Sequence, residues 1–271
     1  MTLDEHSLDR LLNNACRIAR EAGTAIMTIY GQGFDVTEKA DRTPLTEADM
    51  AAHRHIVKGL GELTPEIPIL SEESTQIPFG ERSQWSSYWL VDPLDGTREF
   101  IKRNGEFTVN IALIHDHEPV LGVVFCPALD LLYSAARGLG AHRRRSATAA
   151  AEPIRVNTGQ RVPVIAGSRS HGTERMQALL ERVGEHELIS MGSSLKFCLV
   201  AEGKADLYPR LGPTCEWDTA AAQCVVCEAG GQVTDIHMQP LRYNTKDSLL
   251  NPEFLVIGDT DRNWARYLEG L

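Results

Sequence analysis

The chain has 271 residues, and its 27 Lys and Arg against 37 Asp and Glu give a formal net charge of −10. This balance excludes a large basic face for nucleic-acid polymers. With 42% hydrophobic and 24% charged residues, the composition is that of a globular protein rather than a disordered or fibrous one. A chain of this length buries a sufficient core without disulfides, and its six scattered cysteines do not form a disulfide framework.

The N-terminal residues MTLDEHSLDR contain neither a basic segment nor an apolar run, so they do not predict a signal peptide. The most apolar stretch, residues 120–136, contains Gly122, Pro127 and Asp130 and does not predict a membrane span. The expected location is therefore the cytoplasm. Peripheral contact with the cytoplasmic face of the inner membrane stays open, as does the oligomeric state, because no sequence feature calls for either.

The first half of the chain predicts two helices followed by a sheet. Apolar residues recur at intervals of three and four over residues 8–29, which predicts a helix ending at Gly31 and Gly33. Thr46 and Asp49 have the spacing of a capping box, so a second helix is expected from residue 46 to about residue 60. Short apolar runs between turn formers predict strands at residues 67–70, 88–91, 108–114, 120–125 and 131–136, of which the last three form an antiparallel meander.

The second half alternates between strands and helices. Residues 143–151 (RRRSATAAA) lack an apolar period and predict a loop or lobe boundary. After them, strands are expected at residues 162–166, 188–190, 205–208, 232–234 and 254–257, and helices at residues 174–183, 194–202, 218–229 and 261–268. The predicted fold class is α/β. It comprises one domain, residues 1–271, with an α+β lobe at about 1–142 and an α/β lobe at about 152–271.

Three acidic clusters each lie at the end of a predicted element. Ser71-Glu72-Glu73-Ser74 and Asp92-Pro93-Leu94-Asp95 each follow a strand, and Glu216-Trp217-Asp218 opens a helix. Open sheets build their sites at strand ends, so these clusters are candidates for one site. Each cluster taken alone also fits an ordinary turn, a solvated surface or a helix N-cap.

The cluster from Asp92 to Asp95 is the most informative. Because Pro93 cannot donate a ladder hydrogen bond, the chain is expected to leave the sheet at Asp92. Two carboxylates around so tight a turn can converge, and convergent carboxylates repel each other unless they are protonated or bind a cation. Such hard oxygen ligands suit Mg²⁺, and the neighbouring Thr97 hydroxyl could orient a water.

Taken together, these strings resemble a known family. Residues 92–100 (DPLDGTREF), with LSEE at 70–73 and CEWDTA at 215–220, resemble the inositol monophosphatase superfamily of Mg²⁺-dependent, lithium-sensitive phosphatases. The matches extend from about residue 39 to residue 231. Residues 100–114 (FIKRNGEFTVNIALI) and 192–218 (GSSLKFCLVAEGKADLYPRLGPTCEWD) are similar to its 3′(2′),5′-bisphosphate nucleotidase branch. The resemblance implies a layered α/β/α/β/α sandwich.

The resemblance also implies a set of metal ligands. Glu72, Asp92 and Asp95 would bind Mg²⁺, and Leu94 would contribute its backbone carbonyl. Asp218 would bind a second ion together with Asp92. Two or more Mg²⁺ ions are therefore expected, and they explain how a chain of charge −10 can bind a polyanion.

Further roles follow from the same resemblance. Thr97, together with Glu72, would activate the attacking water, and Asp49 would assist through an additional metal or water. The backbone N–H groups of Gly96 and Thr97 would hold the phosphate that is cleaved. The expected reaction removes the 3′-phosphate of adenosine 3′,5′-bisphosphate and leaves AMP.

A bisphosphate substrate needs cations for its second phosphate. Lys196 and Arg210 are the candidates, because both side chains bind phosphate oxygens well. Ser193 and Ser194 can add hydrogen bonds, and Asp218 would also face the substrate. Without the resemblance, Lys196 and Arg210 would be assigned to a solvated surface.

Other motifs point to no competing chemistry. Cys224 and Cys227 form a lone C-x-x-C within a predicted helix, which favours two core residues over a redox or zinc site. His53 and His55 lie two apart on a predicted helix and cannot share a face. The sequence has no glycine-rich phosphate loop and no Gly-x-Ser-x-Gly elbow, so kinase, dehydrogenase and serine hydrolase activities lack support.

Two classes of function remain. The first is a metal-dependent phosphatase acting on adenosine 3′,5′-bisphosphate or, alternatively, on inositol monophosphate. The second is a non-catalytic protein that binds nucleotide or metal. The complete set of Glu72, Asp92, Asp95, Thr97 and Asp218 favours the enzyme, because a degenerate copy would be expected to lose at least one of them.

Overall fold

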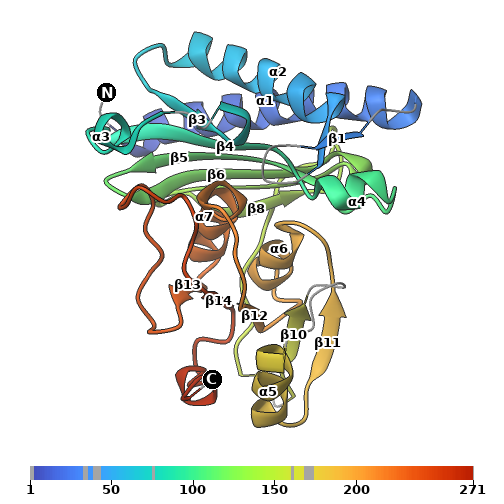
Figure 1. Cartoon of the computed structure of the whole chain (residues 1–271), viewed down its shortest axis with the longest axis vertical. Helices are drawn as coiled ribbons and strands as arrows, with labels where there is room; N and C mark the ends of the chain where they lie inside the picture. Colours follow the sequence, from blue (N-terminus) through green and yellow to red (C-terminus); the bar gives the residue numbers. More distant parts are fainter. Residues whose placement is uncertain are drawn as a thin grey trace.

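A computed structural model describes residues 3–32, 36–38, 44–74, 77–159, 162–167 and 174–270. Its upper half is a seven-stranded sheet covered by two long helices, α1 (Glu5–Gln32) and α2 (Glu47–Leu63) (Figure 1). The strand order is β3 (Ile69–Ser71), β4 (Ser87–Asp95), β5 (Thr108–His115), β6 (Glu118–Cys126), β7 (Leu131–Ala136), β8 (Gly140–Arg144) and β9 (Glu152–Pro153). The pair β3–β4 is parallel, and every other neighbouring pair is antiparallel.

The lower half is a five-stranded mixed sheet. Its strand order is β11 (Glu187–Ser190), β10 (Val164–Gly167), β12 (Leu207–Arg210), β14 (Phe254–Ile257) and β13 (Gln232–Asp235). Helices α6 (Leu195–Ala201) and α7 (Ala220–Glu228) lie between the two sheets, and α5 (Glu174–Val183) lies beyond the lower one (Figure 1). The five layers confirm the predicted α/β/α/β/α sandwich.

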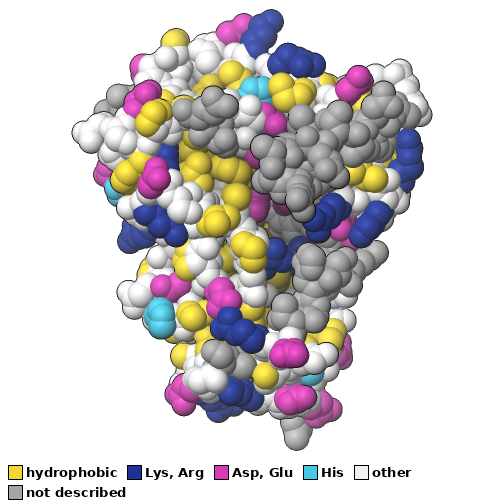
Figure 2. All heavy atoms as spheres, in the orientation of Figure 1, with side chains coloured by type: hydrophobic (Ala, Val, Ile, Leu, Met, Phe, Trp, Pro, Cys, Tyr) yellow, Lys and Arg dark blue, Asp and Glu magenta, His cyan; other side chains and the backbone are white. Residues whose placement is uncertain are grey.

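Shorter elements complete the described chain: β1 (Val36–Glu38), β2 (Pro44–Thr46), η1 (Glu72–Ser74), α3 (Phe79–Arg82), α4 (Thr97–Ile101), η2 (Pro127–Leu129), η3 (Glu216–Asp218) and η4 (Ala265–Tyr267). No helix in this part of the chain is both long enough and apolar enough to cross a membrane. On the face shown in Figure 2, Lys and Arg side chains lie interspersed with Asp and Glu.

Burial follows the sequence periodicity. The apolar stripe of α1 packs with α2 on one face of the seven-stranded sheet, and all the residues of α6 are buried between the sheets. The N-terminus of α2 has the predicted capping box, in which the Thr46 hydroxyl accepts from the N–H of Ala48 and Asp49 accepts from the N–H of Thr46. This cap matters for function because it also fixes the Asp49 carboxylate.

The prediction that the chain leaves the sheet at Asp92 is wrong. Strand β4 continues through Pro93 to Asp95, and its register shifts between the pairs Asp92–Asn110 and Asp95–Thr108. A bulge leaves one residue without a ladder partner, so the missing N–H of proline is tolerated there. The bulge keeps both aspartates attached to a buried strand.

Other boundaries also differ from the prediction. Arg143 and Arg144 belong to strand β8 rather than to a loop, and Arg143 forms ion pairs with Glu152 and Glu202. The helix expected at 261–268 is only the turn η4, beside which the Trp264 indole donates to the carbonyl of Asp259. Helix α1 passes Gly31 and ends at Gln32, and Gly33 lies outside the described residues. The division into lobes at 1–142 and 152–271 stays a proposal.

The contact between the upper sheet and α7 depends on Gly122. A Cβ atom at this position would lie 2.1 Å from the carbonyl oxygen of Ala221 and 2.9 Å from the Cβ of Cys224. Gly122→Ala is therefore expected to lower the free energy of unfolding by about 1–3 kcal/mol in a urea titration. The control is Gly61→Ala in α2, where an added Cβ meets no atom within 4 Å and should be neutral or stabilising. Equal stabilities of the two variants would contradict the close approach.

Candidate active site

Three carboxylates from two distant segments converge between the sheets. Asp92 and Asp95 come from the bulged end of β4, and Asp218 comes from η3. One carboxylate oxygen of each lies within 4.8 Å of the others. Strands β3 and β4 pair in parallel with Ser71 opposite Val91, so Glu72 emerges beside Asp92 and forms a side-chain hydrogen bond with it. The structure thus brings the three predicted acidic clusters together.

Each of the three aspartates accepts a backbone N–H. Asp92 accepts from Leu94 at 3.0 Å, Asp95 from Ser194 at 2.6 Å, and Asp218 from Cys215 at 2.9 Å. Such bonds favour the ionised carboxylate and fix its orientation. The aspartates are therefore held in place by the main chain.

The cluster is electrostatically strained without a counter-ion. Asp92 is 1% exposed, and burial together with Glu72, Asp95 and Asp218 raises its pKa well above the ordinary value. Burial and then Asp95 raise the pKa of Asp218 to about 8. A divalent cation removes this repulsion, and carboxylate oxygens are the ligands that Mg²⁺ prefers. The residues present therefore fit a Mg²⁺ site.

Thr97 lies between Asp49 and the bulge. Its hydroxyl is 3.3 Å from Oδ1 of Asp49 and 3.3 Å from the carbonyl oxygen of Leu94. The other oxygen of Asp49 accepts from the backbone and the hydroxyl of Thr46. The carbonyl of Leu94 and the hydroxyl of Thr97 thus occupy adjacent positions.

Ser194 hydrogen-bonds the carboxylate of Asp95. Its N–H and its hydroxyl donate to Oδ2 of Asp95 at 2.6 and 2.8 Å. Asn110 and Thr108 on β5 lie around the same groups, with the Thr108 hydroxyl 2.8 Å from that of Ser194. Sequence analysis missed these two residues, although their polar side chains interrupt an otherwise apolar strand.

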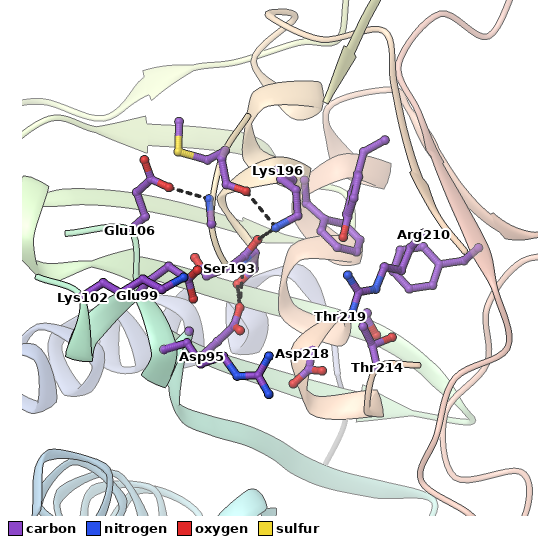
Figure 3. Close-up of a pocket in the computed structure, with 18 residues that line it drawn as sticks. Asp95, Glu99, Lys102, Glu106, Ser193, Lys196, Arg210, Thr214, Asp218 and Thr219 are labelled. Carbon is purple, nitrogen blue, oxygen red and sulfur yellow. Dashed lines mark hydrogen bonds between the residues drawn. The ribbon is translucent and has the colours of Figure 1, made fainter. Parts of the chain in front are cut away.

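A pocket of about 260 Å³ opens above Asp95 and Asp218. The predicted residues on its wall are Gly96, Ser193, Ser194, Lys196 and Arg210. Those that were not predicted include Arg98, Glu99, Lys102, Glu106, Tyr208 and Thr214. Glu99, Lys102 and Glu106 lie on the opposite side of Ser193 from Arg210 (Figure 3). Four cationic side chains thus line the pocket of an acidic protein.

The glycine at position 96 is required by the turn. Its φ is +89°, and an added Cβ would lie 3.2 Å from the carbonyl oxygen of Glu106. L-residues rarely adopt this conformation, so the turn that presents Thr97 needs glycine.

Lys196 is 6% exposed and lies 5.3 Å from the ring centre of Tyr208. Its ammonium donates to the carbonyls of Ser193 and Met191 at 2.8 and 3.2 Å, and burial lowers its pKa to about 8. Two buried donors nearby, the Ser193 hydroxyl and Nε of Arg210, have no hydrogen-bond partner among the described residues. A ligand in the pocket could satisfy both.

The arrangement of acidic residues agrees with the family to which the sequence can be matched. The pattern of the inositol monophosphatase family matches residues 7–265, and the chain belongs to this family. Members are generally Mg²⁺-dependent, and the acidic cluster is compatible with that requirement.

Individual relatives are similar over almost the whole chain. The 3′(2′),5′-bisphosphate nucleotidase CysQ of Escherichia coli K12 is 51% identical over 249 residues, covering 91% of this chain and 99% of that protein. The crystal structure of CysQ from Bacteroides thetaiotaomicron has a TM-score of 0.81 and 41% identity, covering 94% and 98% of the two chains. The Thermotoga maritima IMPase has a TM-score of 0.78 and 26% identity, covering 96% and 97%.

Mg²⁺ is expected to stabilise the protein more at pH 8 than at pH 6. Because the folded-state pKa of Asp218 is raised to about 8 from an ordinary 3.8, the metal-free protein loses stability as the pH rises between these values. Mg²⁺ binds the ionised carboxylates and competes with protons below pH 8. At pH 8, saturating Mg²⁺ should raise the Tm by about 5 °C over EDTA in a thermal-shift assay. An equal rise at both pH values would show that these carboxylates do not bind the ion.

Proposed function

We propose that the protein is a Mg²⁺-dependent phosphomonoesterase that hydrolyses adenosine 3′,5′-bisphosphate to AMP and phosphate. CysQ of Escherichia coli K12 supports this substrate, since it is 51% identical and is named a 3′(2′),5′-bisphosphate nucleotidase, whereas the Thermotoga maritima IMPase is 26% identical. The proposal includes a cytoplasmic location and a small-molecule substrate.

The observation that carries the proposal is the position of cations beside the carboxylate cluster. Lys196 and Arg210 line the same pocket as Asp95 and Asp218, and the buried donors on Ser193 and Arg210 lack partners among the described residues. A substrate with two phosphates matches this arrangement, with one phosphate at the metals and the other at the cations. The set of carboxylates is complete, which supports an enzyme rather than a binding protein.

The roles of the residues follow from their positions. Glu72, Asp92, Asp95 and the Leu94 carbonyl would hold one Mg²⁺, and Asp218 with Asp92 would hold a second. When bound, Mg²⁺ neutralises phosphate charge and acidifies water, so no histidine base is needed. The backbone N–H groups of Gly96 and Thr97 then orient the phosphate for attack.

Thr97 and Glu72 orient the attacking water. When the Thr97 hydroxyl donates to Asp49, its oxygen lone pairs remain available to accept from a water. The oxygen of the water forms a bond to phosphorus as the bond from phosphorus to the 3′ oxygen breaks, and the proton lost by the water replaces phosphorus on the 3′ oxygen, which gives AMP and inorganic phosphate. Ser194 acts on this reaction through Asp95, whose orientation it fixes.

The test is phosphate release from adenosine 3′,5′-bisphosphate and inositol 1-phosphate, measured side by side with Mg²⁺, with EDTA and with added lithium. We expect a large preference in kcat/KM for the nucleotide, loss of activity in EDTA and inhibition by lithium. The Asp92→Asn variant should fold but lose about a thousandfold or more in kcat, and it thereby controls for contaminating phosphatases. A preference for the inositol ester would support the alternative substrate, and no release from either would favour the binding protein.

The side chains of Lys196 and Arg210 are expected to bind the second phosphate of the substrate. Lys196→Ala and Arg210→Ala are each expected to lower kcat/KM for adenosine 3′,5′-bisphosphate by about 10- to 100-fold. Adenosine 3′-monophosphate has the same scissile ester but no 5′-phosphate, so its kcat/KM should fall much less. Lys204→Ala is the matched control, since Lys204 is exposed and pairs with Glu202. Equal losses on both substrates would remove the role in binding the second phosphate.

A further inference from the structure

One face of helix α2 contacts two segments that border the carboxylate cluster. Asp49 and His53 are four residues apart and therefore project from the same face of the helix. Asp49 lies 3.3 Å from the hydroxyl of Thr97, and Nδ1 of His53 lies 2.9 Å from the hydroxyl of Ser71. Ser71 directly precedes Glu72, so this helix contacts the chain next to both residues that are proposed to orient the water.

Ser71 lies where the chain leaves the sheet. It is the last residue of β3 and is fully buried. The next residue, Glu72, opens the turn η1 and meets Asp92 on the neighbouring strand. A hydrogen bond to the Ser71 side chain therefore restrains the bend from which the Glu72 carboxylate projects.

His53 differs from the other histidine on this helix. It is half-buried, and burial lowers its pKa, so the imidazole is neutral at pH 7 and has one donor and one acceptor nitrogen. His55 is 43% exposed and instead pairs with Glu21 on α1. Of these two histidines, His53 is therefore the one that hydrogen-bonds the segment leading to Glu72.

We propose that His53 is a positioning residue for the reaction, acting through the Ser71 hydroxyl to set the Glu72 carboxylate against Asp92. The proposal rests on the proposed role of Glu72 in binding metal and orienting water. Partners one contact removed from a metal ligand change metal affinity or activity by about 10- to 100-fold when they are lost. A displacement of the Glu72 carboxylate would affect turnover and Mg²⁺ dependence while leaving the Lys196 and Arg210 side of the pocket intact.

The experiment compares His53→Ala, Ser71→Ala and the double variant, with His55→Ala as the matched control. For His53→Ala we expect kcat on adenosine 3′,5′-bisphosphate to fall by about 10- to 100-fold and the Mg²⁺ concentration for half-maximal activity to rise, with KM unchanged. The Mg²⁺-induced rise in Tm should also shrink, which gives a readout without turnover. Ser71→Ala should have the same effects. The double variant should be no worse than either single variant, because all three variants lose the same hydrogen bond between His53 and Ser71.

Other outcomes would overturn the proposal. One is that His53→Ala has the same kcat and Mg²⁺ dependence as His55→Ala. Another is that the loss of kcat in the double variant equals the product of the losses in the two single variants. His53→Asn keeps a hydrogen-bonding atom near the position of Nδ1 and should recover most of the turnover. Failure of this variant to recover activity at a normal Tm would also count against the proposal.

Glu72→Gln separates the proposal from the function on which it rests. If Glu72→Gln retains turnover and Mg²⁺ dependence, the proposed metal site is wrong and the role of His53 falls with it. If Glu72→Gln is inactive while His53→Ala matches His55→Ala, only the inference about His53 is wrong.

Discussion

The mutual repulsion of the carboxylates around Asp92 is the constraint on which this structure depends. Four acidic side chains meet at a position where Asp92 is almost completely buried, and burial, followed by the neighbouring carboxylates, raises the pKa of both Asp92 and Asp218. Such an arrangement opposes folding unless protons or cations neutralise it. The chain offsets part of the cost by giving each aspartate a backbone N–H, and a divalent cation would supply the remainder.

The site also requires both sheets to pack together. Asp92 and Asp95 belong to the upper sheet, whereas Ser194 and Asp218 lie at the starts of α6 and α7 in the layer between the sheets. The layer of α6 and α7 joins the two sheets through one continuous apolar core. Gly122 lets α7 approach the upper sheet closely, so the packing of this layer decides whether the carboxylates meet. Metal binding and global stability are therefore coupled in this fold.

Local charge resolves the apparent conflict between an acidic protein and an anionic substrate. The net charge is −10, yet Arg98, Lys102, Lys196 and Arg210 line one pocket. Lys196 is buried, with its ammonium hydrogen-bonded to two backbone carbonyls and 5.3 Å from the ring centre of Tyr208. Recognition of phosphate thus depends on the arrangement within the pocket rather than on the field of the whole molecule.

Periodicity and spacing are local properties, so they were enough to predict the order of most elements, the capping box of α2 and the acidic motifs. The other contacts form only when the chain is folded. The tertiary structure placed Pro93 in a bulge, brought Glu72 to Asp92 through a parallel strand pair, directed Ser194 to Asp95 and occupied two donors of Lys196 with carbonyls. These contacts join residues through strand register and layer packing, and no spacing along the chain encodes them. Thr108 and Asn110 were missed for the same reason, since a polar residue in a strand acquires its role only from the neighbour that it meets.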